Sequence, residues 1–295
     1  MKPAKFDYHA PTTVEEAVDI LHAFPEEAKI LAGGQSLVPS MNFRLARPTI
    51  LVDINNVGGI DGVGTSGDRL SIGTLVRHRR LERSVTEDPV GSLLSAAAHF
   101  VGHLPIRTRG TFGGSICHVD PAAEWCLIAT ALDAEMVATS VEGQRRIAAA
   151  DFFETVFTTS LQPDEMLTEV TLPLLGGNAR IGFAEFSRRA GDFAIVAAAV
   201  TISVTDGIIR SASLGLGGVG PTAVRAREAE TVLVGHEPSR RLFDEAGAIA
   251  AANVEPLEDI HGSADYRKDL VRVMVRKALD QTLEGSDAAS TTAVG

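Results

Sequence analysis

Two glycine pairs with hydroxyl groups beside them are the residues of this chain whose types and spacing could do chemistry. The first lies in LAGGQSLVP (31–39) and the second in TFGGS (111–115). Because glycine has no Cβ, its backbone reaches positive φ, and successive N–H groups can converge on one anion. Two such cradles predict a ligand with two phosphates. The candidate donors are Gly33, Gly34, Gln35 and Ser36 in the first loop and Thr111, Gly113, Gly114 and Ser115 in the second.

Each glycine pair taken alone is equally well read as a tight turn. The flanking residues favour a cradle, since each loop follows an apolar or β-like segment. A helix beginning after the first loop would add its dipole to the attraction for an anion. Arg107 and Arg109 flank the second loop, where they either balance a diphosphate or lie solvated on the surface.

Hydrophobic spacing predicts the elements that hold the first loop. Thr12 and Thr13 each precede a glutamate by three residues, which predicts a capped helix that ends at Pro25. A short strand at 29–31 runs into the loop, Ser36 is expected to cap a following turn or helix, and TILVDI (49–54) is the next strand.

The middle of the chain is expected to alternate short strands and helices. Pro89 opens an alanine-rich helix, and Asp120 is expected to cap a helix whose first residue is Pro121. Glu142-Gly143 is a plausible hairpin turn.

The part after LGGNA (175–179) has a different pattern. Strands are expected at 181–188, 193–204 and 208–217, and Asp206-Gly207 is a favoured two-residue hairpin turn between the last two. Helices are expected at about 222–234, 239–252 and 264–283.

Composition excludes several classes of protein. The chain has 295 residues, long enough for about two domains. A net charge of −11 opposes nucleic-acid binding, and its longest apolar stretch, 193–204, is too short to span a membrane. The charged, proline-containing start does not resemble a signal peptide, so we expect a cytoplasmic protein. Two cysteines exclude a disulfide scaffold and leave too few ligands for an iron–sulfur cluster.

Three further motifs resemble sites and have simpler interpretations. GLGGVG (215–220) satisfies the dinucleotide-binding pattern, but two helices follow it instead of a strand, which favours a structural turn. His99 and His103 are spaced like zinc ligands, yet no third ligand is evident and we expect no metal site. His118 and Asp120 invite an acid–base interpretation, for which helix capping by Asp120 is the simpler account.

Five stretches carry a resemblance to a known family: LAGGQSLVPSMNFRLARPTILVDINNV (31–57), IRTRGTFGGSICHVDPAAEW (106–125), DEMLTEVTLP (164–173), RRAGDFAIVAAAV (188–200) and GLGGVGPTAVRA (215–226). In this order they strongly resemble the FAD-binding medium subunit of the molybdenum hydroxylases, the family of carbon monoxide dehydrogenase, xanthine dehydrogenase and N-heterocycle dehydrogenases. The resemblance implies an α+β protein. Its FAD-binding fold is of the p-cresol methylhydroxylase type in two subdomains, 1–57 and 58–176. A C-terminal α+β domain with a three-stranded antiparallel sheet and helices follows at 177–285, and then a disordered tail at 286–295.

The same resemblance implies where the cofactor is held. Ala32 to Ser36 and Thr111 to Ser115 correspond to the pyrophosphate contacts, and Glu124 to an acidic contact with the flavin's sugar or ribityl region. Leu167 corresponds to a leucine that packs on the ring, and Phe193 to an aromatic residue that covers it. The remaining cofactor positions implied are Leu31, Leu37, Val101, Gly102, Ile106 and Glu185.

Two residues depart from the family pattern. Gln35 replaces a histidine found in many members, and it cannot form the histidyl linkage of some related oxidases, so noncovalent FAD is expected. Glu185 stands where some members have a lysine near the flavin pyrimidine edge, which reverses the local charge.

By this resemblance the chain is an electron-transfer subunit with no substrate-contacting catalytic residue. A large partner carries molybdopterin, a small partner carries [2Fe–2S] clusters, and a dimer of heterotrimers is implied, with NAD, a quinone or dioxygen as the electron acceptor. One alternative is an independent flavin-dependent oxidoreductase, although no substrate base is evident. The other is a flavin-free structural subunit, in which the glycine loops are only turns.

Overall fold

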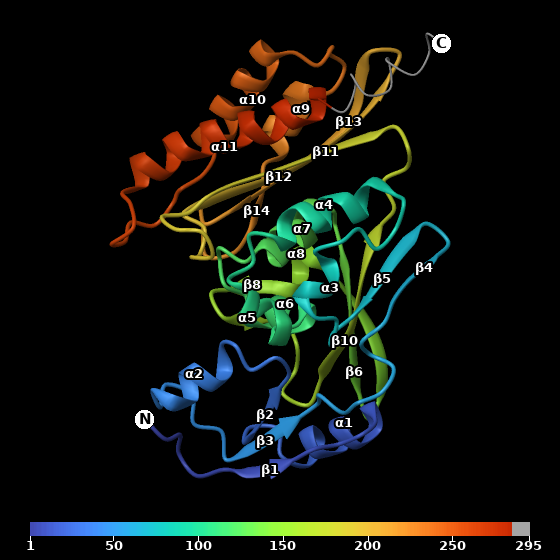
Figure 1. Cartoon of the computed structure of the whole chain (residues 1–295), viewed down its shortest axis with the longest axis vertical. Helices are drawn as coiled ribbons and strands as arrows, with labels where there is room; N and C mark the ends of the chain where they lie inside the picture. The colour runs from blue at the N-terminus through green and yellow to red at the C-terminus, as the bar shows by residue number, and fades with distance from the viewer. Residues whose placement is uncertain (285–295) are drawn as a thin grey trace. The chain divides into compact units, whose positions relative to one another are not determined.

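The computed structural model describes residues 1–284, which form two compact units by packing (Figure 1). The first comprises 1–80, 103–119 and 134–172, and the second comprises 81–102, 120–133 and the chain from Pro173 onward. The predicted boundaries at 57/58 and 176/177 divide the chain by sequence instead of by packing, and they stay predictions. The tail predicted to be disordered, 286–295, lies outside the described residues.

A small parallel sheet in the first unit positions the first glycine loop. Its strand order is β1 (Asp7–His9), β3 (Ile50–Asp53) and β2 (Ala28–Leu31), with β3 parallel to both neighbours. The helix α1 (Val14–Ala23) begins at the predicted cap, where the Thr13 hydroxyl accepts a hydrogen bond from the Glu16 N–H at 3.2 Å. Leu31 pairs with Asp53 at the carboxyl ends of both strands, so the segments that follow leave the sheet at one edge.

An antiparallel sheet completes the first unit. Its order is β4 (Val63–Ser66), β5 (Arg69–Gly73), β10 (Met166–Pro173), β6 (Glu135–Ser140) and β7 (Gly143–Ala148). The predicted β6–β7 hairpin is present, but its turn residues are Val141 and Glu142, because Gly143 already pairs with Ser140. The short elements nearby are α2 (Leu37–Asn42), α3 (His78–Leu81), α5 (Leu104–Arg109), α6 (Phe112–His118), α8 (Ala149–Phe152), β8 (Phe153–Thr155) and β9 (Thr158–Thr159).

The second unit is built on an antiparallel sheet of β11 (Ala179–Phe186), β12 (Val196–Thr205), β13 (Ile208–Gly217) and β14 (Val224–Arg225). Asp206 and Gly207 both have positive φ, 53° and 76°, which confirms the predicted hairpin turn. The expected three-stranded sheet has a fourth strand, β14, in the region predicted to be helical. Two residues are too few to show a period, and the helix α9 (Arg227–Leu233) begins only after them.

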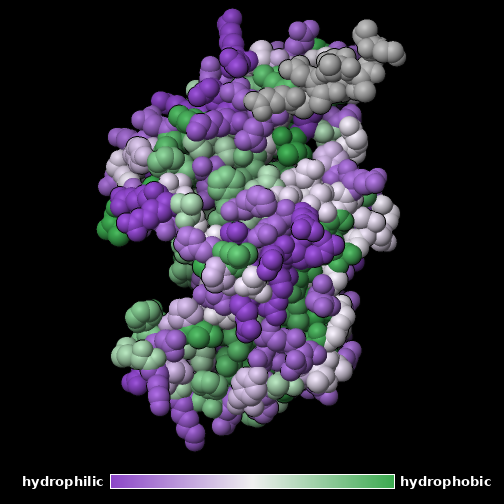
Figure 2. Space-filling view, in the orientation of Figure 1, coloured by the Kyte–Doolittle hydropathy of each residue, from purple (hydrophilic) through white to green (hydrophobic). Residues whose placement is uncertain are grey.

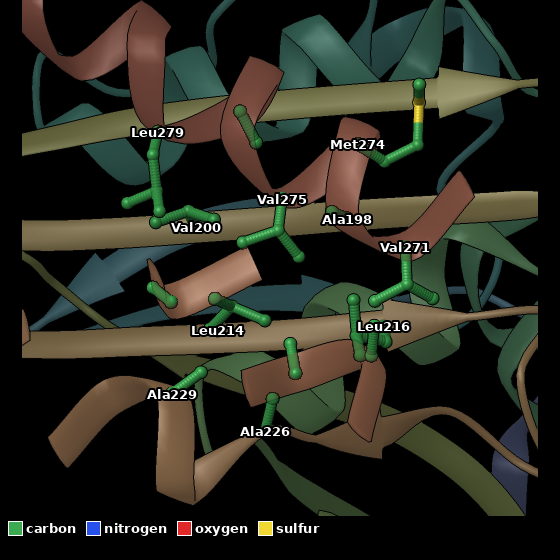
Figure 3. Packing of buried hydrophobic residues seen from close by; sticks show 14 of the residues in the cluster. Ala198, Val200, Leu214, Leu216, Ala226, Ala229, Val271, Met274, Val275 and Leu279 are labelled. Carbon is green, nitrogen blue, oxygen red and sulfur yellow. The ribbon is translucent and has the colours of Figure 1, made fainter. Parts of the chain in front are cut away.

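Helices cover both faces of this sheet. On one face α9, α10 (Arg240–Ala252) and α11 (Ala264–Glu284) bury the even-numbered strand residues, as Figure 3 shows for Val200 and Leu214 beside Val275. On the other face lie α4 (Pro89–Ala98) and α7 (Glu124–Ala131). There a Cβ at Gly215 of β13 would meet Leu127 and Ala131 of α7. Because side chains alternate across a strand, the odd-numbered residues 213–217 of β13 face α7.

The start of α7 differs from its prediction. Asp120 was expected to cap a helix beginning at Pro121, but α7 begins at Glu124 and its N-cap is Ala123. The Asp120 carboxylate instead accepts the Ala122 N–H at 2.9 Å in a local turn. Glu124 is therefore the first residue of the helix.

Close packing between β11 and α11 generates a stability prediction. A Cβ at Gly182 would overlap the carbonyl oxygen of Ala278. We expect Gly182→Ala to lower the free energy of unfolding by about 1–3 kcal/mol, as overpacking does. The control is Gly177→Ala in the same unit, whose Cβ would meet no atom within 4 Å. Urea unfolding followed by circular dichroism compares the two, and equal effects would contradict the packing account.

Candidate functional site

The first glycine loop presents backbone donors that the chain itself does not use. Gly34 adopts positive φ, 72°, as the cradle hypothesis requires. Among the hydrogen bonds of residues 1–284, none engages the N–H groups of the four successive residues 33–36. Ser36 was expected to cap α2, but its side chain makes no capping hydrogen bond. The helix therefore does not use the Ser36 hydroxyl. The loop is half-buried apart from the exposed Gln35, so it offers accessible donors to an anion.

A polar network fixes this loop to the sheet edge. The side-chain amide of Asn55 donates to the Ala32 carbonyl at 2.8 Å and to the Asp53 carboxylate at 2.5 Å. The Tyr8 hydroxyl donates to Asp53 at 2.7 Å. Burial raises the pKa of Asp53, but the hydrogen bonds from Tyr8 and Asn55 more than offset this, so the pKa lies below its usual value. Asp53 is thus an ionised anchor for Asn55.

Arg77 joins the first loop to the segment before the second. Its guanidinium donates to the Asn55 side-chain oxygen at 2.7 Å and to the carbonyl of Arg109. At this junction a Cβ on Gly33 would lie 2.5 Å from the Arg109 oxygen and 2.6 Å from the Gly110 Cα. Gly33 is therefore required because the protein's own backbone approaches it.

The second glycine loop is the start of α6, and its donors are already engaged. The Thr111 hydroxyl caps the helix by accepting the Gly114 N–H at 3.1 Å. The Gly113 N–H donates to the Thr74 carbonyl at 3.0 Å, and the Ser115 N–H to the Thr111 carbonyl at 3.1 Å. A Cβ at Gly113 would overlap the Thr74 side chain. Neither glycine has positive φ. The N–H groups of Gly113, Gly114 and Ser115 thus already have acceptors in the protein, unlike those of the first loop, and contact of this segment with a pyrophosphate stays a prediction.

The other predicted cofactor residues divide between the two units. In the first unit Leu31 ends β2, Leu37 begins α2, Ile106 is in α5, and Leu167 is buried in β10 at 2% exposure. In the second unit Phe193 is 67% exposed between β11 and β12, and Val101 is buried. Gly102, Glu124 and Glu185 also belong to the second unit. The predicted cofactor residues are thus shared between the two units. Their contacts with FAD stay predictions.

The second unit places the buried carboxyl group of Glu124 and the half-buried one of Glu185 in electrostatic contact. Burial, followed by the charge of Asp120, raises the pKa of Glu124 to about 7. Burial and then the charge of Glu124 raise the pKa of Glu185 to about 9. The Glu185 oxygen Oε2 is buried without a hydrogen-bond partner.

The remaining motifs have structural roles or lie apart. Gly215 and Gly217 are in β13, and at Gly218, with φ 76°, a Cβ would lie 2.5 Å from the Ile195 oxygen, so the GLGGVG stretch ends a strand in a tight turn. His99 follows α4 as its C-cap and His103 precedes α5 as its N-cap. Across residues 1–284, no three His, Cys, Asp or Glu side chains gather as metal ligands would. Nor does any helix in the described part of the chain have the length and apolar character needed to cross a membrane.

Comparison with known proteins identifies the family. Residues 4–175 match the FAD binding domain in molybdopterin dehydrogenase, and 181–282 match the CO dehydrogenase flavoprotein C-terminal domain. The chain is 40% identical to the 6-hydroxypseudooxynicotine dehydrogenase complex subunit alpha of Paenarthrobacter nicotinovorans, covering 96% of both chains. It is 34% identical to the carbon monoxide dehydrogenase medium chain of Afipia carboxidovorans, covering 95% of this chain and 98% of that one. Quinoline 2-oxidoreductase from Pseudomonas putida 86 superposes with a TM-score of 0.90 at 35% identity, covering 97% of this chain and 99% of that one.

These matches define a class of FAD-binding oxidoreductase components. The chain belongs to the family of FAD-binding medium subunits of the molybdenum hydroxylases, which confirms both the resemblance and the α+β fold class.

Sequence reasoning missed the residues that position the loops. Asp53, Asn55 and Arg77 form the network at the first loop. The available signal was VDINN (52–56), in which polar side chains follow a buried strand immediately. Nothing in the sequence showed that Arg77 would bridge Asn55 to Arg109.

Arg77 generates a prediction about local stability. We expect Arg77→Met to lower the free energy of unfolding by about 1–3 kcal/mol, since Asn55 and the Arg109 carbonyl lose a donor. Amide exchange should accelerate at Ile54, whose N–H donates to the Leu31 carbonyl, and at Gly110, whose N–H donates to the Ile106 carbonyl at the end of α5. Arg79→Met, at an exposed neighbour, is the control and should change stability by less than about 0.5 kcal/mol. Unchanged exchange in Arg77→Met would show that the network does not hold the loops.

Proposed function

We propose that this chain binds one FAD noncovalently and relays electrons from the [2Fe–2S] clusters of a partner subunit to an external acceptor. The observation that carries the proposal is the row of unengaged N–H groups at 33–36, in a chain whose family binds FAD. A diphosphate supplies the oxygens that such a row accepts.

The fit of the diphosphate is best at the first loop. Gly33 to Ser36 would hold it through backbone N–H groups and the Ser36 hydroxyl. Thr111 to Ser115 would line the neighbouring wall, because the N–H groups of Gly113, Gly114 and Ser115 are already bonded to Thr74 and Thr111. We assign Leu31, Ala32, Leu37, Val101, Gly102, Ile106, Glu124, Leu167, Glu185 and Phe193 to the remaining cofactor contacts.

When bound, FAD supplies redox chemistry that links one-electron and two-electron partners, while the protein orients it and tunes its potential. This chain's own residues do not provide another redox centre. Burial raises the pKa of the Cys117 thiol to about 12, and Cys126 is buried. Neither cysteine forms a disulfide, and two cysteines cannot ligate an all-cysteine cluster.

The proposal places this chain in a cytoplasmic complex. A large subunit would carry molybdopterin and oxidise the substrate, and a small subunit would carry the clusters, in a dimer of heterotrimers. NAD, a quinone or dioxygen would take the electrons. Relatives named for nicotine, caffeine and carbon monoxide share this type of chain, which is consistent with a substrate pocket on another subunit.

A matched glycine pair tests the cradle. Gly34 and Gly67 both have positive φ, 72° and 59°, so alanine at either costs about 1–3 kcal/mol of backbone strain. Only Gly34 lies at the loop, where its Cβ would also come within 3.1 Å of Leu31 and Val38. We expect Gly34→Ala to lower acid-released FAD per chain at least severalfold and Gly67→Ala to retain it. Equal FAD content in both variants would remove the first loop from the site.

Electron flow separates the relay from an independent oxidoreductase. The FAD-loaded chain alone should not be reduced by the organic substrate of the complex, because the proposal puts substrate oxidation at the molybdopterin of the large subunit. Addition of the molybdopterin and iron–sulfur subunits should restore reduction. Anaerobic stopped-flow absorbance measures both, and rapid reduction of the isolated chain would overturn the relay proposal.

A further inference from the structure

Glu124 and Glu185 lie on the same side of the second unit's sheet. Glu185 pairs with Ala197, and Ala197 with Gly217, so these three residues form one row across β11, β12 and β13. A Cβ at Gly217 would meet Leu127 of α7 and the Pro121 carbonyl at 3.6 Å. The row therefore faces α7, whose first residue is Glu124.

A hydrogen bond fixes the start of α7 against the end of this row. The Gly218 N–H donates to the Pro121 carbonyl at 2.8 Å. This contact holds the turn that precedes α7, and it brings the buried Glu124 onto the side occupied by Glu185.

Within residues 1–284, no ion pair neutralises either carboxyl group. Glu124 is 9% exposed, and its one hydrogen bond comes from its own backbone N–H. Glu185 leaves the buried oxygen Oε2 without a partner. Leaving a buried carboxylate oxygen unbonded is costly, whereas a protonated carboxyl can donate to a neighbouring carboxylate.

The surrounding groups do not supply the missing positive charge. The charges that act on the two carboxyls are acidic, Asp120 on Glu124 and Glu124 on Glu185. Of the elements packed against them, α4 and β12 carry no titratable residue, and α7 carries only Cys126 besides Glu124. The buried Arg267 of α11 donates to the Ile195 and Gly218 carbonyls at the end of the row, but it is paired with the Asp259 carboxylate at 2.7 Å. Arg225 of β14 is bonded to Asp133 and Glu230, and Arg180 and Arg210 lie near the opposite ends of β11 and β13.

We propose that Glu124 and Glu185 form a proton-sharing carboxyl pair, which keeps at least one proton at neutral pH and binds a further proton from solvent when the cofactor is reduced. The first half stands on the geometry of this unit alone. The second half rests on the proposed function, because it takes both residues as FAD contacts. Added negative charge on the cofactor disfavours a nearby carboxylate, so the proton moves from solvent to a carboxylate oxygen of the pair.

Burial raises the pKa values of both carboxyl groups, which supports a shared proton. Because the folded-state pKa values of about 7 and about 9 lie above those of unfolded glutamates, the chain favours the protonated pair. The stability contributed by this pair is therefore fully present below the unfolded glutamate pKa of about 4.3. It falls as pH rises from there through the folded pKa values of about 7 and about 9, above which it is lost. Replacing Glu185 with glutamine should remove most of that loss.

Infrared spectroscopy of the FAD-free full chain at pH 8 tests the pair itself. Ordinary glutamates are ionised there, so we expect a protonated carboxyl C=O band in wild type, shifted in D₂O and lost above pH 10. Glu185→Gln should lose the band. Glu245→Gln, which changes an exposed glutamate on α10, should keep it. A wild-type chain without the band overturns the pair.

Proton uptake on reduction tests the link to the cofactor. In the FAD-loaded chain, a pH indicator measures protons bound per FAD during dithionite reduction at pH 8. We expect wild type and Glu245→Gln to take up more protons than Glu185→Gln, and their midpoint potential to vary more steeply with pH. Equal uptake overturns the coupling. If wild type binds no FAD, the proposed function and the coupling both fail, while the infrared band still supports the pair.

Discussion

The close contact between Gly33 and the backbone of Arg109–Gly110 is the constraint on which the first unit's site depends. Two segments that are distant in sequence meet there with no room for a Cβ, and Arg77 bonds to both sides of the junction. Because the loop is restrained by Asn55 and Arg77 from outside, its own N–H groups need no internal acceptor. The restraint by side chains is what leaves the donors available to a ligand.

The two glycine pairs consequently serve different purposes. In the first pair, Gly33 permits the backbone approach and Gly34 supplies the positive φ. In the second, Gly113 makes room for Thr74, while Gly114 lies against the capping hydroxyl of Thr111. Similar sequences thus form an open loop in one case and a packed helix start in the other. The difference follows from what each segment contacts.

Sequence patterns predicted most elements because their signals are local. The Thr13 cap, the Asp206-Gly207 turn and the long amphipathic helices depend on residues a few positions apart. The short strand β14 and the start of α7 were missed, since two residues show no period and Asp120 satisfies a turn as readily as a helix cap. The Asn55–Arg77 network was invisible for another reason: it joins side chains separated by 22 residues through tertiary packing.

The segment after the first loop contains apolar residues that the sequence pattern predicts to be buried but the structure leaves accessible. Leu37, Met41 and Leu45 follow the first loop with helical spacing, which predicts burial, yet Leu37 is only half-buried and Leu45 is exposed, and Figure 2 shows hydrophobic colour over the α2 region. Only Met41 of this segment is buried. The helix is six residues long and buries one side chain, so its own packing contributes little to holding the loop. The position of the first loop must then come from the sheet edge and the Asn55–Arg77 network, because α2 cannot supply it.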